Sequence, residues 1–423
     1  MTVLRKMLFW GAAVVFPLPL LFTYDAVALV PQQLKLYIFL GLIAYAWWLL
    51  AVLLSVRPVW LERLIGLPSI YGLHGMLGVL ALATAYLHQE YSYAPSSGAR
   101  LLGDWAFYGA LAVLCYSAFF ISGWLVDRSR LLLRAKGLLE KVFRHRLSVW
   151  IHRLNLLVIV MIFLHAHLLV RVNQYLGFML LFDAYTVLTF TVYAWRKWIS
   201  PDAFLAGVVV GNEPLGTSAR RISIRLDERC DAVRPGDFLF LSFEAVSREW
   251  HPFSVTDNGQ NILTFTVRTH GDFTSRLDGV TTGTRVRLEG PFGRFDSIAQ
   301  GQPPERPLVL VGMGAGVAPL LSLVSEHHTT RQIRLLWSVR TPEDAYYRSL
   351  LDEYEAASGG QLTTEIKTGR FRREDLTRAL STEEIKQGTF FVVGPGPGVL
   401  GQRRLLRRLG VSPLRLHDER LTM

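Results

Sequence analysis

The hydrophobic residues of this chain are unevenly distributed along it. Residues 1–200 contain six long apolar stretches, at about 7–24, 34–56, 69–88, 105–126, 149–171 and 177–195. Each is close to the roughly 20 residues that an α-helix needs to cross the hydrocarbon core of a bilayer. Residues 201–423 instead alternate polar and apolar positions as globular domains do. The pattern predicts a six-span helical membrane bundle followed by a globular part, with a boundary near "AWRKWISPDAF".

Lysine and arginine are concentrated at the N terminus, in alternate loops and after the last apolar stretch. Examples are Arg5, Arg57, Arg196 and the loop "DRSRLLLRAKGLLEKVFRHR". The positive-inside rule places these segments and the whole C-terminal half in the cytoplasm. The net charge of +11 is therefore explained by orientation in a lipid bilayer, and no nucleic-acid partner is expected. The first stretch also has the features of a cleavable signal peptide, whose removal would leave five spans in the same orientation.

The composition excludes cysteine-ligated clusters. The chain has two cysteines, Cys115 in an apolar stretch and Cys230 in the globular half. Two cysteines without a CxxC spacing provide neither a disulfide framework nor a cysteine-ligated metal cluster.

Two apolar stretches contain histidines at matching depths. His74 and His88 lie fourteen residues apart in the third stretch, so on an ideal helix they share one face, roughly 21 Å apart along the axis. The fifth stretch contains His152 and His165 and runs parallel to the third, which pairs His74 with His152 and His88 with His165. Two facing imidazoles suit the axial positions of a haem iron. Histidines that bond between helices, or a proton path, are the alternatives. A zinc site is disfavoured because no carboxylate or cysteine lies at matching depth.

The spacing in the fifth stretch is not ideal. Thirteen residues turn a regular helix by about 140° away from alignment, so His152 and His165 need a local distortion to share a face. His167, fifteen residues after His152, is only about 60° out of line. Helical geometry alone therefore favours His167 as the outer partner.

Residues 201–302 predict a small antiparallel β-barrel. Strand-like alternation recurs in "RISIRL", "DFLFLSFEA", "ILTFTVRT" and "TRVRLEG". The motif "HPFS", which is His251, Pro252, Phe253 and Ser254, ends one strand region. In "GDFTSRL" a helix start follows Gly271, at Asp272, Phe273 and Thr274. A helix N-terminus with hydroxyl donors suits a pyrophosphate, although a plain strand end and helix cap would look the same.

Residues 303–423 alternate strands and helices, which predicts a parallel sheet in an α/β domain. In "VGMGAGVAP" a buried strand leads through Gly312, Gly314 and Gly316 into a helix with Pro319 in its first turn. Such a turn lets backbone amides approach a phosphate. Arg340 follows the next strand, where an arginine can bind the 2′-phosphate of NADP. A later buried strand ends at Gly394 and Pro395.

The order of histidine-paired spans, "HPFS" and "GMGAGVAP" resembles the NADPH oxidase and ferric reductase superfamily, and above all its compact prokaryotic NADPH oxidases. The resemblance covers nearly the whole chain. It implies a six-span transmembrane di-haem domain at 1–200 and a ferredoxin–NADP reductase-like module. That module comprises an FAD-binding antiparallel β-barrel at 201–302 and an NAD(P)H-binding α/β domain at 303–423. It also implies a bacterial inner (plasma) membrane location with the C-terminal half cytoplasmic.

The same resemblance assigns residues to cofactors. It gives His74 and His152 to an inner b-type haem, and His88 with His165 to an outer one, because related fifth helices have "HRL" followed by "LH" at thirteen or fourteen residues. FAD is assigned to residues 251–254 and 271–274. NADPH, with NADH as an alternative, is assigned to Gly312–Pro319, Arg340 and Gly394–Pro395. Two residues depart from the family pattern: Val393 replaces a usual cysteine and Leu421 replaces a usual aromatic, which leaves the choice of nucleotide open.

The expected activity is transfer of electrons from NAD(P)H through FAD and two haems to O2 on the outer face, which produces superoxide without an obligatory regulatory subunit. A ferric-chelate or other external-acceptor reductase, or an electron relay for a periplasmic partner, are the alternatives. The outer segments "QEYSYAPSSGAR" and "RVNQYLGF" contain no recognisable iron-chelate site, which favours a small acceptor.

Overall fold

A computed structural model describes residues 3–121, 130–139, 145–199, 204–259, 261–269, 271 and 273–421. Asp272, one of the expected FAD-site residues, lies outside them. The chain divides into two compact units, residues 1–200 and 201–423.

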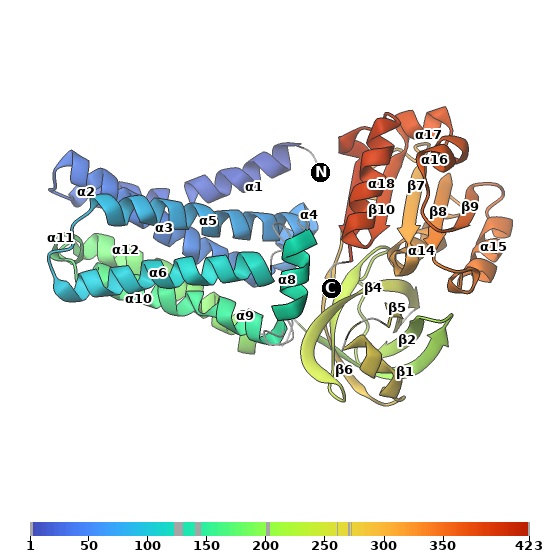
Figure 1. The fold of residues 1–423 in the computed structure, drawn as a ribbon, viewed down its shortest axis with the longest axis horizontal. Coiled ribbons are helices and arrows are strands. Elements are labelled where there is room, and N and C mark those ends of the chain that lie inside the picture. The colour runs from blue at the N-terminus through green and yellow to red at the C-terminus, as the bar shows by residue number, and fades with distance from the viewer. Residues whose placement is uncertain are drawn as a thin grey trace. The chain divides into compact units, whose positions relative to one another are not determined.

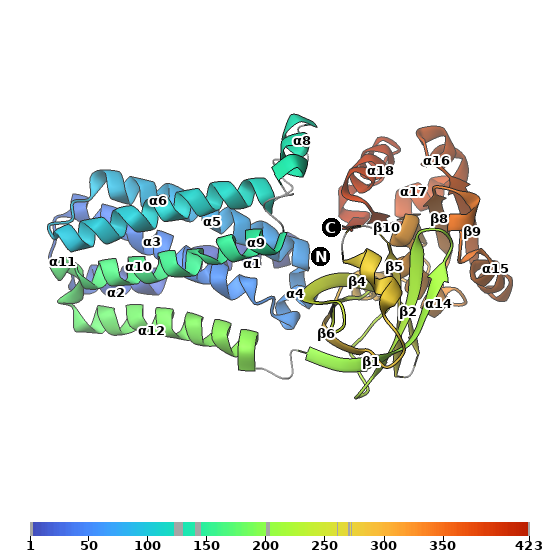
Figure 2. The same cartoon turned by 60° about the horizontal axis from the view of Figure 1, so that its bottom comes forward.

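The first unit is a bundle of helices that run roughly along one another (Figures 1 and 2). Its described helices are α1 (Val3–Val15), α2 (Leu18–Val27), α3 (Gln32–Ser55), α4 (Val59–Ile65), α5 (Leu67–Tyr91), α6 (Ser97–Phe120), α8 (Arg130–Leu139), α9 (His145–Arg153), α10 (Asn155–His167), α11 (Val170–Asn173), α12 (Leu176–Ala194) and η1 (Trp195–Ile199). Six segments are long and apolar enough to cross a membrane: Trp10–Val27, Gln32–Ser55, Leu67–Tyr91, Ser97–Phe120, Leu147–His167 and Leu176–Ile199.

Two of these segments differ from the sequence-based boundaries. The first is divided into α1 and α2 at Pro17, because proline lacks the N–H that a continuous helix needs. The fourth begins at Ser97 and not near residue 105. Its start is fixed by Ser96, whose hydroxyl accepts a hydrogen bond from the Ala99 N–H at 3.3 Å, as a helix N-cap does. The predicted end of this span, at residue 126, lies outside the described residues.

The bundle has an apolar interior and an apolar exterior. α5 packs chiefly against α3, and α10 against α6, while Tyr45 and Phe182 stack in the core with ring centroids 4.6 Å apart. Many large apolar side chains nevertheless face outward, among them Leu101, Leu157, Leu180 and Leu188. Exposed aromatics lie near the helix ends, at Trp60, Trp150 and Trp198 toward one end and at Tyr91, Tyr93 and Trp105 toward the other. Such a surface with aromatic belts is typical of helices in a bilayer.

The second unit begins with a closed six-stranded barrel (Figure 1). Its elements are β1 (Phe204–Leu215), β2 (Ala219–Leu226), β3 (Phe238–Phe243), β4 (Ser247–Gly259), β5 (Ile262–Arg268), η3 (Thr274–Gly279) and β6 (Arg285–Phe292), and its strand order is β1-β2-β5-β4-β3-β6. Neighbouring strands are antiparallel, as expected. The motif at 251–254 does not end a strand, however. It lies within β4, where Pro252 is paired with Phe240 of β3.

A five-stranded parallel sheet with the order β11-β10-β7-β8-β9 completes the unit. Its elements are α13 (Phe295–Gln300), β7 (Leu308–Met313), η4 (Gly314–Val317), α14 (Ala318–His327), β8 (Ile333–Val339), η5 (Pro342–Asp344), α15 (Arg348–Ala357), β9 (Leu362–Thr368), α16 (Arg373–Ala379), α17 (Thr382–Gln387), β10 (Thr389–Gly394), α18 (Gly396–Arg408), η6 (Pro413–Arg415) and β11 (Leu416–Arg420). Apolar clusters lie on both faces of this sheet.

Hydrogen bonds join the barrel to the parallel-sheet domain. The Thr266 and Tyr347 hydroxyls lie 2.6 Å apart. The Gly236 N–H donates to the Ser322 hydroxyl at 2.7 Å, and the Thr217 hydroxyl donates to Asp344 at 3.2 Å. These buried or half-buried bonds hold the two domains of this unit in one arrangement.

We predict an acid-sensitive contribution to stability from Asp375 at the start of α16. Its carboxylate ion-pairs with Lys367 and accepts from the Arg372 N–H at 2.7 Å, and the Lys367 ammonium followed by that N–H holds the pKa of Asp375 below its ordinary value. A depressed carboxyl pKa stabilises the folded state above the unfolded pKa, and this stabilisation is lost as the pH falls through the folded pKa. Asp375→Asn should therefore lower the Tm at pH 7, and the deficit should shrink below about pH 3.9, the ordinary aspartate pKa.

Thermal unfolding of both proteins across this pH range checks the prediction. Glu374→Gln, an exposed position in the same helical turn, is the matched control and should leave the Tm nearly unchanged. An equal Tm deficit for Asp375→Asn at pH 7 and pH 3 would contradict it.

Candidate functional site

The structure brings four of the expected histidines together in two pairs. His74 of α5 and His152 of α9 have ring centroids 5.7 Å apart. His88, further along α5, and His165 of α10 have ring centroids 6.4 Å apart. Each pair joins the two helices that the sequence predicted to face each other.

The Nδ1 atom of each of three rings is bound to a main-chain carbonyl of a neighbouring helix. A carbonyl oxygen only accepts hydrogen bonds, so Nδ1 must donate and Nε2 keeps its lone pair. The bonds run from His74 to Ala51 O at 2.9 Å, from His88 to Tyr37 O at 2.8 Å and from His165 to Ala99 O at 2.6 Å.

His152 reaches the same state through a hydroxyl. Ser117 of α6 donates its hydroxyl proton to Val113 O at 2.7 Å, so its oxygen accepts from His152 Nδ1, 2.8 Å away. The Nε2 lone pairs of His74, His152 and His165 are therefore left for another partner, and that of His88 has only a long 3.5 Å contact with the Ser92 hydroxyl. A metal-binding histidine is normally oriented in this way, with its other ring nitrogen donating to a carbonyl.

Glycines allow the outer rings to approach the neighbouring helices closely. A Cβ atom at Gly41 of α3 would lie 2.8 Å from His88 Nδ1. A Cβ atom at Gly103 of α6 would lie 3.1 Å from the His165 ring. Any side chain at Gly41 would push the imidazole away from its carbonyl.

The pair geometry suits a metal between the rings. Two metal–nitrogen bonds of about 2.0 Å each, plus roughly 1 Å from each nitrogen to its ring centre, require centroids about 6 Å apart. The observed separations of 5.7 and 6.4 Å lie on either side of that value. With two imidazole donors and no carboxylate in either pair, the donor set fits the axial positions of a haem.

His165, and not His167, faces His88. His167 Nδ1 donates to Phe163 O of its own helix at 2.9 Å, and its Nε2 lies 3.2 Å from an Asp183 carboxylate oxygen on α12. The ideal-helix argument for His167 was wrong because the helix is interrupted at Leu154, between α9 and α10. There the Leu154 N–H binds Ile151 O at 3.0 Å, a tighter turn that rotates the chain by about 120° per residue.

In the barrel, the "HPFS" motif meets the turn at residues 271–274. The His251 ring stacks on Phe273 with centroids 3.7 Å apart, and Phe253 lies 6.3 Å from the same ring. Gly271 has a left-handed φ of 86°, and Thr274 begins η3. β4 and this turn thus form one surface, with Ser254 buried beside it.

The three glycines after β7 have different roles. A Cβ atom at Gly316 would lie 2.5 Å from Val393 O, so Gly316 is required where the turn packs on the end of β10. Gly312 packs against Val317 and Leu320 in the same way, at 3.3 Å. Gly314 has a left-handed φ of 56° and nothing within 4 Å of its Cβ position, so that side of its backbone is open, while its carbonyl accepts from the Trp337 indole N–H at 3.0 Å. Pro319 lies in the first turn of α14.

Arg340 has a cationic neighbour that the sequence analysis missed. Arg340 follows β8, and Arg370 follows the adjacent parallel strand β9. The Gly369 N–H binds Val339 O at 2.8 Å, which places the two exposed arginines beside each other at the carboxyl edge of the sheet. Only the strand order reveals this, because thirty residues separate the two in sequence.

The late glycine motif lies beside the C terminus. Leu421 donates its N–H to Gly394 O at 2.9 Å and packs on the core of the parallel-sheet domain. Val393 is fully buried, and Pro395 caps α18. The two residues that depart from the family pattern therefore lie next to Gly394.

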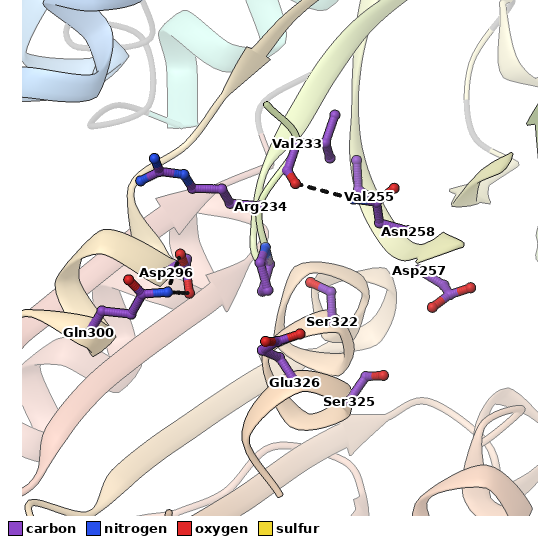
Figure 3. Close-up of a pocket in the computed structure, with 11 residues that line it drawn as sticks. Val233, Arg234, Val255, Asp257, Asn258, Asp296, Gln300, Ser322, Ser325 and Glu326 are labelled. Atoms are coloured by element: carbon purple, nitrogen blue, oxygen red, sulfur yellow. Dashed lines mark hydrogen bonds between the residues drawn. The ribbon is translucent and has the colours of Figure 1, made fainter. Parts of the chain in front are cut away.

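A separate cavity of about 440 Å³ lies between the barrel and α14 (Figure 3). Its lining includes three carboxylates, from Asp257, Asp296 and Glu326. Asp296 accepts two bonds from Gln300, at 3.1 and 3.0 Å. Arg234 also lines it, and none of its lining residues belongs to the glycine turn at 312–319, so this cavity is distinct from the turn expected to bind a nucleotide.

Comparisons with known proteins concern mainly the second unit. A family model described as an FAD-binding domain matches residues 215–296, and one described as the C-terminal domain of adenylate-forming reductase 03009 matches residues 306–392. The chain is 32% identical over 168 residues to the reductase component of propane 2-monooxygenase from Rhodococcus jostii, covering 36% of this chain and 45% of that protein. The chain thus spans less than half the length of that relative.

Two further relatives differ in how much of their own length matches this chain. The probable electron transfer subunit of dihydroorotate dehydrogenase B from Methanothermobacter thermautotrophicus is 33% identical over 196 residues, 44% of this chain and 67% of that protein. Respiratory burst oxidase homolog protein B of Oryza sativa is 34% identical over 120 residues, 22% of this chain and 13% of that protein. Among solved structures, a cytochrome P450 reductase from Amycolatopsis is 22% identical and covers 52% of this chain and 70% of its own, with a TM-score of 0.46.

The matched FAD-binding region, the matches to reductase components and the barrel followed by a parallel sheet all concern residues 201–423. Through this C-terminal half, the chain belongs to the ferredoxin–NADP reductase-like family of FAD-dependent, NAD(P)H-linked oxidoreductases.

Proposed function

We propose that this chain is a membrane-spanning oxidase that carries electrons from cytoplasmic NAD(P)H through FAD and two b-type haems to O2 on the outer face, where superoxide is released. The observation that carries the proposal is the presence, in one chain, of two imidazole pairs at two levels of an apolar bundle and a reductase module. The six apolar helices and their aromatic ends support a bacterial inner-membrane location.

Residues of the C-terminal half would bind FAD and the nucleotide, and residues of the N-terminal half would bind the haems. When bound, FAD accepts a hydride from NAD(P)H and releases single electrons, which haem iron can take. Gly314 and the start of α14 would hold the nucleotide pyrophosphate, and the surface formed by His251, Phe253 and Phe273 would hold FAD. The four histidines would hold two irons, one per pair, and the two α5 histidines are roughly 21 Å apart along that helix.

The ligand set also favours superoxide as the product. Each pair supplies two imidazoles, which leaves no coordination position for an acceptor. An acceptor at the outer face would then receive one electron at a time, and one electron added to O2 gives superoxide. The relatives named respiratory burst oxidase homologs support an oxidase.

We predict that the purified full-length chain, loaded with FAD and haem, oxidises NADPH only when O2 is present. Cytochrome c reduction in the same assay should fall when superoxide dismutase is added, because superoxide would be the carrier. The measurement is the rate of each reaction with and without oxygen and dismutase.

Oxygen-independent NADPH oxidation with a ferric chelate, and dismutase-insensitive reduction of cytochrome c, would instead indicate an external-acceptor reductase. An enzyme that is reduced by NADPH but transfers electrons only to an added protein would indicate a relay. An enzyme without haem would contradict all three functions.

We predict that Gly41→Ala selectively weakens the outer haem site. The added Cβ would lie 2.8 Å from His88 Nδ1 and displace the ring from its carbonyl. Loss of such a supporting bond typically lowers metal affinity by roughly 10–100-fold. Haem per chain, measured as the pyridine complex, should therefore decrease while FAD content is unchanged.

Gly78→Ala is the matched control, because its Cβ would make only an ordinary 3.8 Å contact with Leu114. It should keep the haem content of the unsubstituted chain. Full haem content in Gly41→Ala would show that His88 does not need its bond to Tyr37 O.

We predict that Arg340 and Arg370 together select NADPH. Replacing either by Ala should raise the KM for NADPH roughly tenfold, the loss expected for one charge-assisted hydrogen bond, and should change the KM for NADH little. Steady-state kinetics with both nucleotides test this, with Arg404→Ala on α18 as the exposed control. Equal effects on both nucleotides would remove the 2′-phosphate role.

A further inference from the structure

A half-buried arginine lies beside the outer histidine pair. Arg171 is in α11, the short helix that connects α10 to α12. It follows His165 by six residues, just beyond the end of α10 that contains that histidine. It therefore lies close to the proposed outer haem, at the end of the bundle opposite α9 (Figure 1).

The position of Arg171 is fixed by the bundle core. The Tyr24 hydroxyl donates to Arg171 O at 3.0 Å, and Tyr24 itself is fully buried. The Tyr24 ring makes edge contacts with Phe178 and Tyr175, with centroids 5.1 and 6.0 Å away. Arg171 is thus anchored by packed aromatic residues from α2 and α12.

The Arg171 guanidinium has no anionic partner among the described residues. Its Nε atom is buried and makes no hydrogen bond there. Two carboxylates on the neighbouring helices α6 and α12 are engaged elsewhere: Asp104 accepts from Gln89 at 3.0 Å, and Asp183 lies 3.2 Å from His167. Burial of this cation lowers the pKa of Arg171.

A half-buried cation without an anion carries a desolvation cost that no ion pair offsets. A ligand that brings a carboxylate would remove the cost, and a carboxylate matches the two parallel N–H groups of a guanidinium. Haem carries two propionate carboxylates, and the imidazole pair beside Arg171 suits its iron.

We propose that Arg171 binds a propionate carboxylate of the outer haem and so fixes the rotation of that haem about its iron–histidine axis. The proposal rests on the proposed di-haem function. It makes Arg171 a cofactor-binding residue that no sequence motif marks.

The test uses the full-length, haem-loaded chain without NADPH or acceptor. Arg171→Gln should lower the affinity for one of the two haems roughly tenfold or shift only that haem to a lower midpoint potential in an equilibrium redox titration. Arg171→Lys should restore part of the effect. Arg100→Gln is the matched control, because Arg100 also lies near the outer end but is exposed, over the Tyr93 ring at 5.2 Å, and it should change neither haem.

Haem whose propionates are converted to methyl esters identifies the source of the carboxylate. The unsubstituted chain loaded with the ester should behave like Arg171→Gln with ordinary haem, and the substitution should then have no further effect. If Arg171→Gln shifts the potential equally with either haem, Arg171 does not bind a propionate.

Two other results would also overturn the proposal. Unchanged haem properties with a raised KM for ferric citrate but not for O2 would assign Arg171 to the carboxylate of an external acceptor. Unchanged haem properties with altered binding of phospholipid would assign it to a lipid headgroup. An unsubstituted chain that binds no haem is a different outcome, because it removes the proposed function itself.

Discussion

Each imidazole buried in the bundle must satisfy two ring nitrogens, and this requirement determines how the surrounding helices pack. An unsatisfied buried polar group costs about 1–3 kcal/mol. His88 and His165 meet half of the requirement with carbonyls of α3 and α6. Those bonds set the tautomer and orient the two rings, whose centroids lie 6.4 Å apart. Because the acceptors are main-chain atoms, no substitution at Tyr37 or Ala99 can delete them.

A substitution at a neighbouring small residue can, however, fill the space that the imidazole ring occupies. For His74, His88 and His165, a small residue lies one helical turn after the residue whose carbonyl accepts the Nδ1 hydrogen bond. For His152, the small residue Ser117 itself provides the accepting hydroxyl. These residues are Gly41 after Tyr37, Gly103 after Ala99, Ser55 after Ala51 and Ser117 after Val113. Gly41 and Ser55 are fourteen residues apart, as are Gly103 and Ser117. That spacing equals the one between His74 and His88, so the second and fourth spans repeat the register of the third.

This register explains what the sequence could and could not predict. The spacing of His74 and His88 was sufficient to predict a shared face. The pairs of small residues fourteen positions apart in the second and fourth spans could have predicted the helices that support those rings. The partner of His88 was not predictable from ideal geometry, because the tight turn at Leu154 changes the phase of the fifth span. The proximity of Arg340 and Arg370 depends on strand order. The unpaired state of Arg171 depends on the positions of carboxylates from other helices.

The reductase unit, like the bundle, has a glycine that allows close packing of a neighbouring element beside a cofactor site. Gly316 is required because the main chain of Val393 and Gly394 lies where its side chain would be, just as Gly41 is required by the His88 ring. In both places a glycine leaves room for a neighbouring element to pack closely beside an expected cofactor site. The geometry of the sites therefore depends on positions that carry no chemistry of their own. An alanine at such a position changes neither charge nor hydrophobicity noticeably, yet it moves a ligand by the width of a methyl group, which an iron–nitrogen bond or a pyrophosphate contact does not tolerate.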